Sequence, residues 1–239
     1  MGCIFIFKVK QPEKSVAHAK KSYDGAKGKP EGQVNLIFRN LLEGFKYAFS
    51  NQVIVAVIVI TVFMNLLLFP YMTMVTVVSK VLLEVGPFLM GILMASDGFG
   101  ALVGSAIIAA QSGMKSHGRV FFYGSILSLI SLLLFSISGS YMFSVFTLLF
   151  LGCGTAGFGT MQSAIVLLVS DTEYRGRALG TVTIAIGAGP IGALIIGMVS
   201  ENIGVANALL INAFAGLVIV SLCGWLMPSI RQDMDVKSP

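Results

Sequence analysis

The sequence predicts an all-α integral membrane protein, a bundle of six transmembrane helices. Apolar residues make up 56% of the 239 residues and charged residues 11%, whereas soluble proteins carry about 25% charged residues. A soluble domain of this size needs more charged surface to cover its core. The apolar residues also lie in long blocks of about 20, the length that crosses the ~30 Å hydrocarbon core of a bilayer. We therefore expect the lipid bilayer, and not nucleic acid, to be the partner of this basic chain.

Six apolar blocks define the predicted spans, and the short connections between them require neighbouring helices to run antiparallel. The blocks cover residues 53–78, 87–110, 120–137, 142–169, 179–199 and 205–226. We expect three parts in the chain. Residues 1–50 contain the end of a preceding helix, a cytoplasmic linker and an amphipathic helix that leads into the first span. Residues 51–228 form the six-helix domain, and residues 229–239 form a C-terminal tail.

The basic residues are divided unevenly between the two sides of the predicted bundle. The side with both chain ends receives, besides those ends, Lys115, Arg119, Arg175 and Arg177. The opposite side receives Lys80, Glu84 and Glu201. Because cytoplasmic loops are enriched in Lys and Arg, this asymmetry predicts a multi-pass protein of the cell membrane with both termini in the cytoplasm.

Asp97 is the one charged residue that lies well inside a predicted span, and this span is the second, residues 87–110. A carboxylate at bilayer depth costs about 2.5–3.5 kcal/mol on insertion scales, so such a group indicates a functional site by default. Gly100 and Gly104 follow at helical offsets, so we expect this small, polar face to point into the bundle. One interpretation is that Asp97 is a protonatable site that couples substrate movement to a proton gradient. The other is that Asp97 is hydrogen-bonded to a neighbouring helix or simply faces a wet cavity, and both interpretations stay open.

The other candidate contacts lie on the first, fourth and fifth spans. In the first, Thr61, Asn65, Met72 and Thr76 are expected on one face and Pro70 interrupts the helix, which is typical of a bendable, cavity-lining segment. Asn65 is equally compatible with simple hydrogen bonding between helices. Candidate cavity contacts on the later spans are Gln162 and Thr183.

Glycine and proline residues indicate flexible or closely packed parts of two spans. The fourth span contains Gly152, Gly154, Gly157 and Gly159, and glycines at this density allow helices to approach closely. In the fifth span, the candidates for conformational change are Gly187, Gly189, Pro190 and Gly192. Pro190 removes a backbone hydrogen bond and predicts a kink. Tight packing without movement explains any single glycine equally well.

The sequence contains no set of residues that predicts catalysis, a metal site or a cofactor. The predicted spans contain no His residue, and Asp97 has no second carboxylate in another span, which argues against an intramembrane enzyme. Cys3, Cys153 and Cys223 lack paired spacing, so neither disulfides nor metal ligands are expected. The glycine-rich fourth span follows no predicted strand and does not indicate a dinucleotide loop.

The connection between the fourth and fifth spans resembles that of the C-terminal half of the major facilitator superfamily. In that family it often carries an acidic residue near Arg-Gly-Arg, as do Glu173 and Arg175-Gly176-Arg177 here. The Gly-Pro-x-Gly pattern of the following helix matches residues 189–192, and residues 112–119 look like a degenerate copy of another cytoplasmic loop of the family. The chain looks closest to the drug, macrolide and siderophore exporters, and the resemblance covers residues 45–227.

The resemblance implies that the chain is one half of a transporter. Such transporters have two six-helix halves, each built from three-plus-three inverted repeats, with a small-molecule substrate bound between them. The expected function is secondary active efflux of an amphipathic molecule, driven by protons, together with an N-terminal six-helix half in the same or a separate chain. The alternative is a six-helix membrane scaffold or subunit that does not transport by itself.

Overall fold

The computed structural model describes residues 46–111 and 116–231. All of them belong to one unit of the chain, which begins at Glu43. The elements are α3 (Gln52–Phe63), the π-helix η1 (Met64–Leu68), α4 (Tyr71–Val81), α5 (Pro87–Ala110), α6 (His117–Ser136), α7 (Tyr141–Val169), α8 (Arg175–Ile186), α9 (Gly189–Ile203), α10 (Val205–Leu226) and the 3-10 helix η2 (Pro228–Arg231). The predicted linker and most of the predicted amphipathic helix and C-terminal tail lie outside the described residues.

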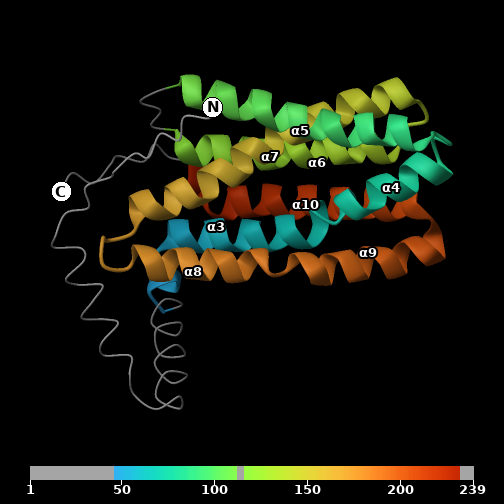
Figure 1. The fold of residues 1–239 in the computed structure, drawn as a ribbon. Helices are drawn as coiled ribbons and strands as arrows, with labels where there is room; N and C mark the ends of the chain where they lie inside the picture. Colours follow the sequence, from blue (N-terminus) through green and yellow to red (C-terminus); the bar gives the residue numbers. More distant parts are fainter. Residues whose placement is uncertain (1–45, 112–115, 232–239) are drawn as a thin grey trace, which may run out of the picture. The chain divides into compact units, whose positions relative to one another are not determined.

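Six helical segments of the described chain are long and apolar enough to cross a membrane, which confirms the predicted fold class. They run antiparallel in chain order (Figure 1). At one end of the bundle, α3, α6 and α8 begin and α5, α7 and α10 end. The six segments agree with the six apolar blocks of the sequence.

The first and fifth spans are each divided into two helical parts. In the first, 30 residues long, the π-helix η1 and Pro70 separate α3 from α4. In the fifth, 29 residues long, the helix is interrupted between Ile186 and Gly189. The predicted interruptions near Pro70 and Pro190 are therefore present. The predicted common face of the first span is not, because Asn65 is 7% exposed and Met72 is 51% exposed.

The helix α7 lies at the centre of one side of the bundle and packs closely against both α5 and α6. Glycines make this approach possible. A Cβ atom on Gly104 would lie 2.7 Å from the Cys153 carbonyl oxygen, and one on Gly124 would lie 2.9 Å from that of Gly154. Such distances are below ordinary van der Waals contact, so the helices are as near as their backbones allow. The helix α10 packs against both α6 and α9, and α3 packs against α8.

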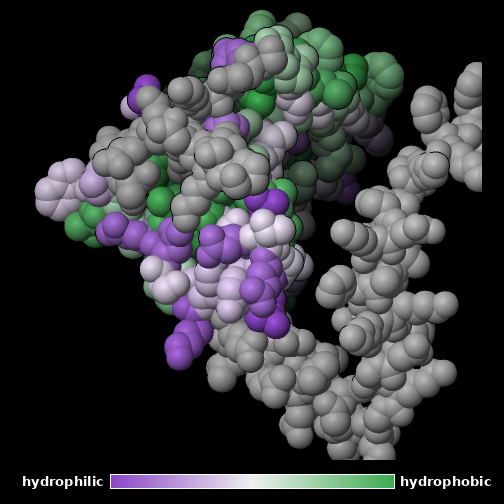
Figure 2. Space-filling model, turned by 90° about the vertical axis from the view of Figure 1, so that its left-hand side faces the viewer, coloured by the Kyte–Doolittle hydropathy of each residue, from purple (hydrophilic) through white to green (hydrophobic). Residues whose placement is uncertain are grey.

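The surface of the described chain has the polarity of a membrane protein. Large apolar side chains stand exposed along the spans, among them Phe88, Leu102 and Trp225, each at least 70% exposed. Such a surface would be unusual on a soluble monomer and suits contact with lipid. Hydrophilic side chains gather at the end of the bundle at which α3 and α8 begin (Figure 2). The charged loop before α8 lies at this end.

Candidate functional site

The break in the first span changes the backbone hydrogen bonds around it, and a side chain of α10 bonds to one of its carbonyl groups. Pro70 has no N–H group, so it cannot bond to the carbonyl group four residues earlier, that of Leu66. The helix widens ahead of it, and the Phe69 N–H donates instead to the Met64 carbonyl oxygen at 3.0 Å. From α10, the Asn212 side chain donates to the Leu67 carbonyl oxygen at 3.3 Å. Such π-turns are frequent at functional sites because they free backbone groups.

The break in the fifth span lies beside the break in the first. Gly192 packs directly against the Leu66 carbonyl group, where a side chain would have no room. A Cβ atom on Gly189 would come within 3.9 Å of the Asn65 side-chain oxygen. The two interrupted helices therefore meet at their interruptions. Paired broken helices of this kind build the binding sites of many transporters, since their backbone groups are not used within the helix.

A buried polar cluster joins the first and fourth spans one turn before this contact. The Thr61 hydroxyl group donates to the Gln162 side-chain oxygen at 3.2 Å. The Asn65 amide group donates to the Thr61 carbonyl oxygen at 2.9 Å. All three side chains are less than 9% exposed. The structure thus brings together the predicted contacts Asn65 and Gln162, each bonded within the bundle, and their contact with a substrate stays a prediction.

Thr183 stands apart from this cluster. It is exposed on α8, and its hydroxyl group donates to the Leu179 carbonyl oxygen of the same helix at 3.1 Å. It takes no part in the Thr61–Gln162 cluster and faces the outside of the described bundle. For Thr183 to contact a substrate, a cavity around it must therefore be completed by groups outside the described residues.

Asp97 forms a second polar site, with Tyr71 from the first residue of α4. The Tyr71 hydroxyl group donates to one carboxylate oxygen of Asp97 at 2.9 Å. The other oxygen, Oδ1, is buried and has no hydrogen-bond partner among the described residues. Both side chains line a cavity of about 220 Å³, whose remaining walls are Met72, Val75, Met94 and Leu148. A carboxylate in such apolar surroundings can exchange a proton or meet a cation.

The small face that follows Asp97 points into the bundle, as predicted. Gly100 packs against the Leu149 backbone and Gly104 against that of Cys153, both on α7. The backbone of Asp97 itself lies against Gly152. Asp97 is therefore fixed at the α5–α7 contact, while its side chain reaches across to α4.

The charged loop before α8 is tied to the segment that precedes the first span. The rings of Tyr47 and Tyr174 are stacked, with centroids 4.5 Å apart. The Tyr47 hydroxyl group donates to the Asp171 carboxylate at 3.2 Å and accepts from the Asp171 backbone N–H at 2.9 Å. The Arg177 guanidinium group lies 5.5 Å from the Tyr174 ring centre. Ion pairs in this loop that form and break between conformations remain a prediction.

Sequence reasoning did not find three residues of these sites: Tyr71, Asn212 and Tyr47. A signal existed for two of them. Tyr71 follows Pro70 directly, and Asn212 is a polar residue inside the last apolar block. Nothing in the sequence indicates that Tyr47 meets Asp171, which is 124 residues away.

The fold and these sites define a class, a multi-pass helical membrane protein with two broken spans that meet. A model of the family described as transmembrane secretion effector matches residues 24–238. The chain belongs to this family of major facilitator superfamily transporters. None of the curated proteins matches the chain. Family membership favours transport over catalysis.

Proposed function

We propose that the chain is one six-helix half of a secondary active transporter, which exports an amphipathic small molecule by alternating access coupled to protons. The observation that carries the proposal is the meeting of the two broken spans at Gly192 and Leu66. Elements interrupted at the same depth can bend there, while the continuous helices α5, α6 and α7 remain a rigid frame. A description as a secretion effector is in keeping with export.

Asp97 is the proposed coupling group. It lies within a span, it faces a cavity with Tyr71, and its Oδ1 atom has no described partner. The groups that face it from the packed elements are the Tyr71 hydroxyl of α4 and the apolar Leu148 of α7. A proton on Asp97 would neutralise the charge in the cavity and change its bond to α4. This links proton binding to α4, the second part of the broken first span.

The proposal includes a second six-helix half, in the same full-length chain or in a separate chain. Its support is the resemblance to two-half transporters and the exposed polar Thr183 on α8. The proposal also places the protein in the cell membrane with both termini in the cytoplasm. This orientation is supported by the positive charge of Arg175 and Arg177 at the end of the bundle where α8 begins, because cytoplasmic loops are enriched in Arg and Lys.

The test is a flux assay in proteoliposomes with an imposed pH gradient. The wild-type chain is compared alone and together with its six-helix partner half, with a fluorescent amphipathic amine as the probe. We expect gradient-driven, saturable flux only with the partner. Saturable flux by the chain alone would contradict the half-transporter proposal, and no flux in either case would favour a non-transporting scaffold.

The coupling role is tested by Asp97→Asn in the complete transporter. The substitution keeps the size of the side chain and removes its proton exchange. We expect flux to lose its dependence on the pH gradient. The matched control is Glu201→Gln, at the exposed end of α9, which should leave this dependence unchanged. An unchanged pH dependence in Asp97→Asn rules out Asp97 as the coupling group.

A further inference from the structure

The first and second spans resemble the fourth and fifth spans in sequence. Residues 61–68 read TVFMNLLL and residues 144–151 read SVFTLLFL, with Val, Phe and two Leu at the same places. The second span has Gly-Ala-Leu at residues 100–102, and the fifth span has it at residues 192–194. Inverted repeats of three spans leave weak internal similarity of this kind. Residue 61 therefore corresponds to residue 144, and residue 100 corresponds to residue 192.

The structure repeats one contact between corresponding residues. Gly100 of α5 packs against the Leu149 carbonyl group of α7. Gly192 of α9 packs against the Leu66 carbonyl group of η1, and both of these residues are the counterparts of the first two. Three positions of the fifth span are also buried where the second span is buried: Ala185, Gly192 and Ile196, which correspond to Leu93, Gly100 and Gly104. At this depth the first span therefore packs on the fifth as the fourth packs on the second.

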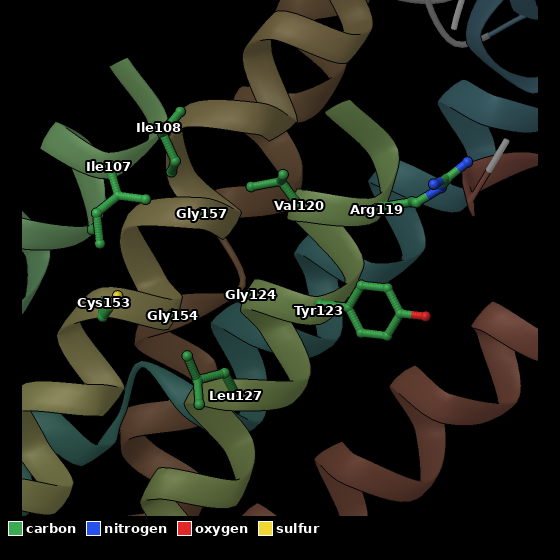
Figure 3. Close-up of a pocket in the computed structure, with 11 residues that line it drawn as sticks. Ile107, Ile108, Arg119, Val120, Tyr123, Gly124, Leu127, Cys153, Gly154 and Gly157 are labelled. Carbon is green, nitrogen blue, oxygen red and sulfur yellow. The ribbon is translucent and has the colours of Figure 1, made fainter. Parts of the chain in front are cut away.

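Three residues further along, the fourth span packs on the second through another glycine. Gly152 lies directly against the Asp97 carbonyl group, where a side chain would have no room. The helix α7 continues through this contact without interruption. Figure 3 shows Cys153, Gly154 and Gly157 on the uninterrupted part that follows, between α5 and α6. Straight packing of these two spans therefore depends on the absence of a side chain at residue 152.

The corresponding position in the first span is Phe69, and here the symmetry of the two pairs fails. The counterpart of Asp97 is Gly189, so a straight first span would direct the Phe69 side chain at the Gly189 carbonyl group. A phenylalanine has no room in a contact that admits only glycine. The first span is interrupted at this point instead, because the π-helix η1 ends at Phe69 and α4 begins after Pro70.

The Phe69 side chain finds its place on another helix. Its ring lies against the ring of Phe158 on α7, with the centroids 5.9 Å apart. Phe158 in turn is stacked on Phe121 of α6, with the centroids 5.3 Å apart. The interruption thus turns Phe69 away from the fifth span and onto aromatic rings that belong to the continuous helices.

We propose that Phe69 holds the first span in its broken form, because it occupies a place at which straight packing requires glycine and its ring is seated on Phe158. Pro70 removes one backbone hydrogen bond, but Phe69 prevents the span from returning to a straight course. Of the two corresponding pairs of spans, only the pair with Phe69 can therefore bend. This role of Phe69 goes beyond the proposed function, since it holds whether or not the chain transports.

The test is double electron–electron resonance on the full chain in lipid nanodiscs, with the native cysteines replaced by alanine. Spin labels at Val81 and Ile137 measure the position of α4, because both residues are exposed and lie at the ends of α4 and α6. A second pair, at Phe88 and Ile137, measures the distance between α5 and α6. This second distance should stay unchanged in every variant and checks that the variant folds.

The variants separate the effect of Phe69 from that of the proline. Pro70→Ala alone should keep the wild-type distance between Val81 and Ile137. Phe69→Gly/Pro70→Ala should shift this distance, because the first span can then pack on the fifth as α7 packs on α5. The matched control is Phe63→Gly/Pro70→Ala, which adds the same glycine to α3 at a place outside this contact. A shift in Pro70→Ala alone, or no shift in Phe69→Gly/Pro70→Ala, would overturn the proposal.

A further variant tests the seat of the Phe69 ring and keeps Phe69 itself. Phe158→Ala removes the ring against which Phe69 lies, so the distribution of distances between Val81 and Ile137 should become broader. The matched control is Phe122→Ala, which removes a ring of α6 that packs against Gly224 of α10. Equal widths in Phe158→Ala and the wild type would also contradict the proposal, because α4 would then be fixed by other contacts.

Discussion

Gly192 of α9 lies against the Leu66 carbonyl group of η1, so the two broken spans touch at their breaks. A Cβ atom at this glycine would also lie 2.8 Å from the Pro70 side chain. On the α9 side the contact is therefore made by the backbone of Gly192. On the other side it is made by the Leu66 carbonyl group and Pro70, which lie at the break of the first span. A change in the bend of the first span must shift the fifth span with it, because no flexible side chain lies between them to absorb the movement.

Gly192→Ala is expected to destabilise the protein by about 1–3 kcal/mol, the cost of overpacking a filled contact. The matched control is Gly197→Ala on the same helix, where a Cβ atom meets nothing within 4 Å. That variant should be neutral or slightly stabilising, because Ala favours helix by about 1 kcal/mol over Gly. Free energies of unfolding in mixed detergent measure both. Equal effects of the two substitutions would show that the contact at Leu66 is not tight.

The class of fold was predictable because composition and charge are properties of whole segments. Long apolar blocks can be satisfied in a bilayer only by helices that bond their own backbone, so six blocks predict six spans. Pro70 likewise marks the interruption of the first span, since its missing N–H acts locally. The six spans and this interruption were therefore found without knowledge of any tertiary contact.

The partners of the site residues were not predictable, because they depend on how helices rotate against one another. Asn65 was expected to share a face with Met72, but the π-helix widens the turn between them and rotates α4 relative to α3. Tyr71, the first residue after Pro70, bonds to Asp97, which is 26 residues away along the chain. Thr61 and Gln162 were each noticed as polar residues of a span, and only the packing of α3 on α7 shows that they meet.

Thr61→Val is expected to lower the free energy of unfolding by about 0.6 kcal/mol, and by no more than about 1.7 kcal/mol, the range for hydrogen bonds between membrane helices. The substitution leaves the Gln162 oxygen without its donor. Thr183→Val is the matched control, because the hydrogen bond of that hydroxyl group among the described residues lies within α8, and the side chain is exposed. Unfolding in mixed detergent again gives the values. A Thr61→Val effect no larger than the control's would mean that the bond to Gln162 contributes nothing.

Tyr47 is expected to anchor the start of the first span to the loop before α8 by two separable interactions. Tyr47→Phe removes both hydrogen bonds to Asp171 and keeps the ring stacked on Tyr174, so it should cost about 0.5–1.5 kcal/mol. Tyr47→Ala also removes the stacking, and a double-mutant cycle with Tyr174→Ala should give a coupling of about 0.5–1.5 kcal/mol. Because the site is exposed, both values should fall at the low end of these ranges. A coupling energy of zero would mean that the stacked rings contribute nothing, and the hydrogen bonds between Tyr47 and Asp171 alone would then hold the loop to the start of the first span.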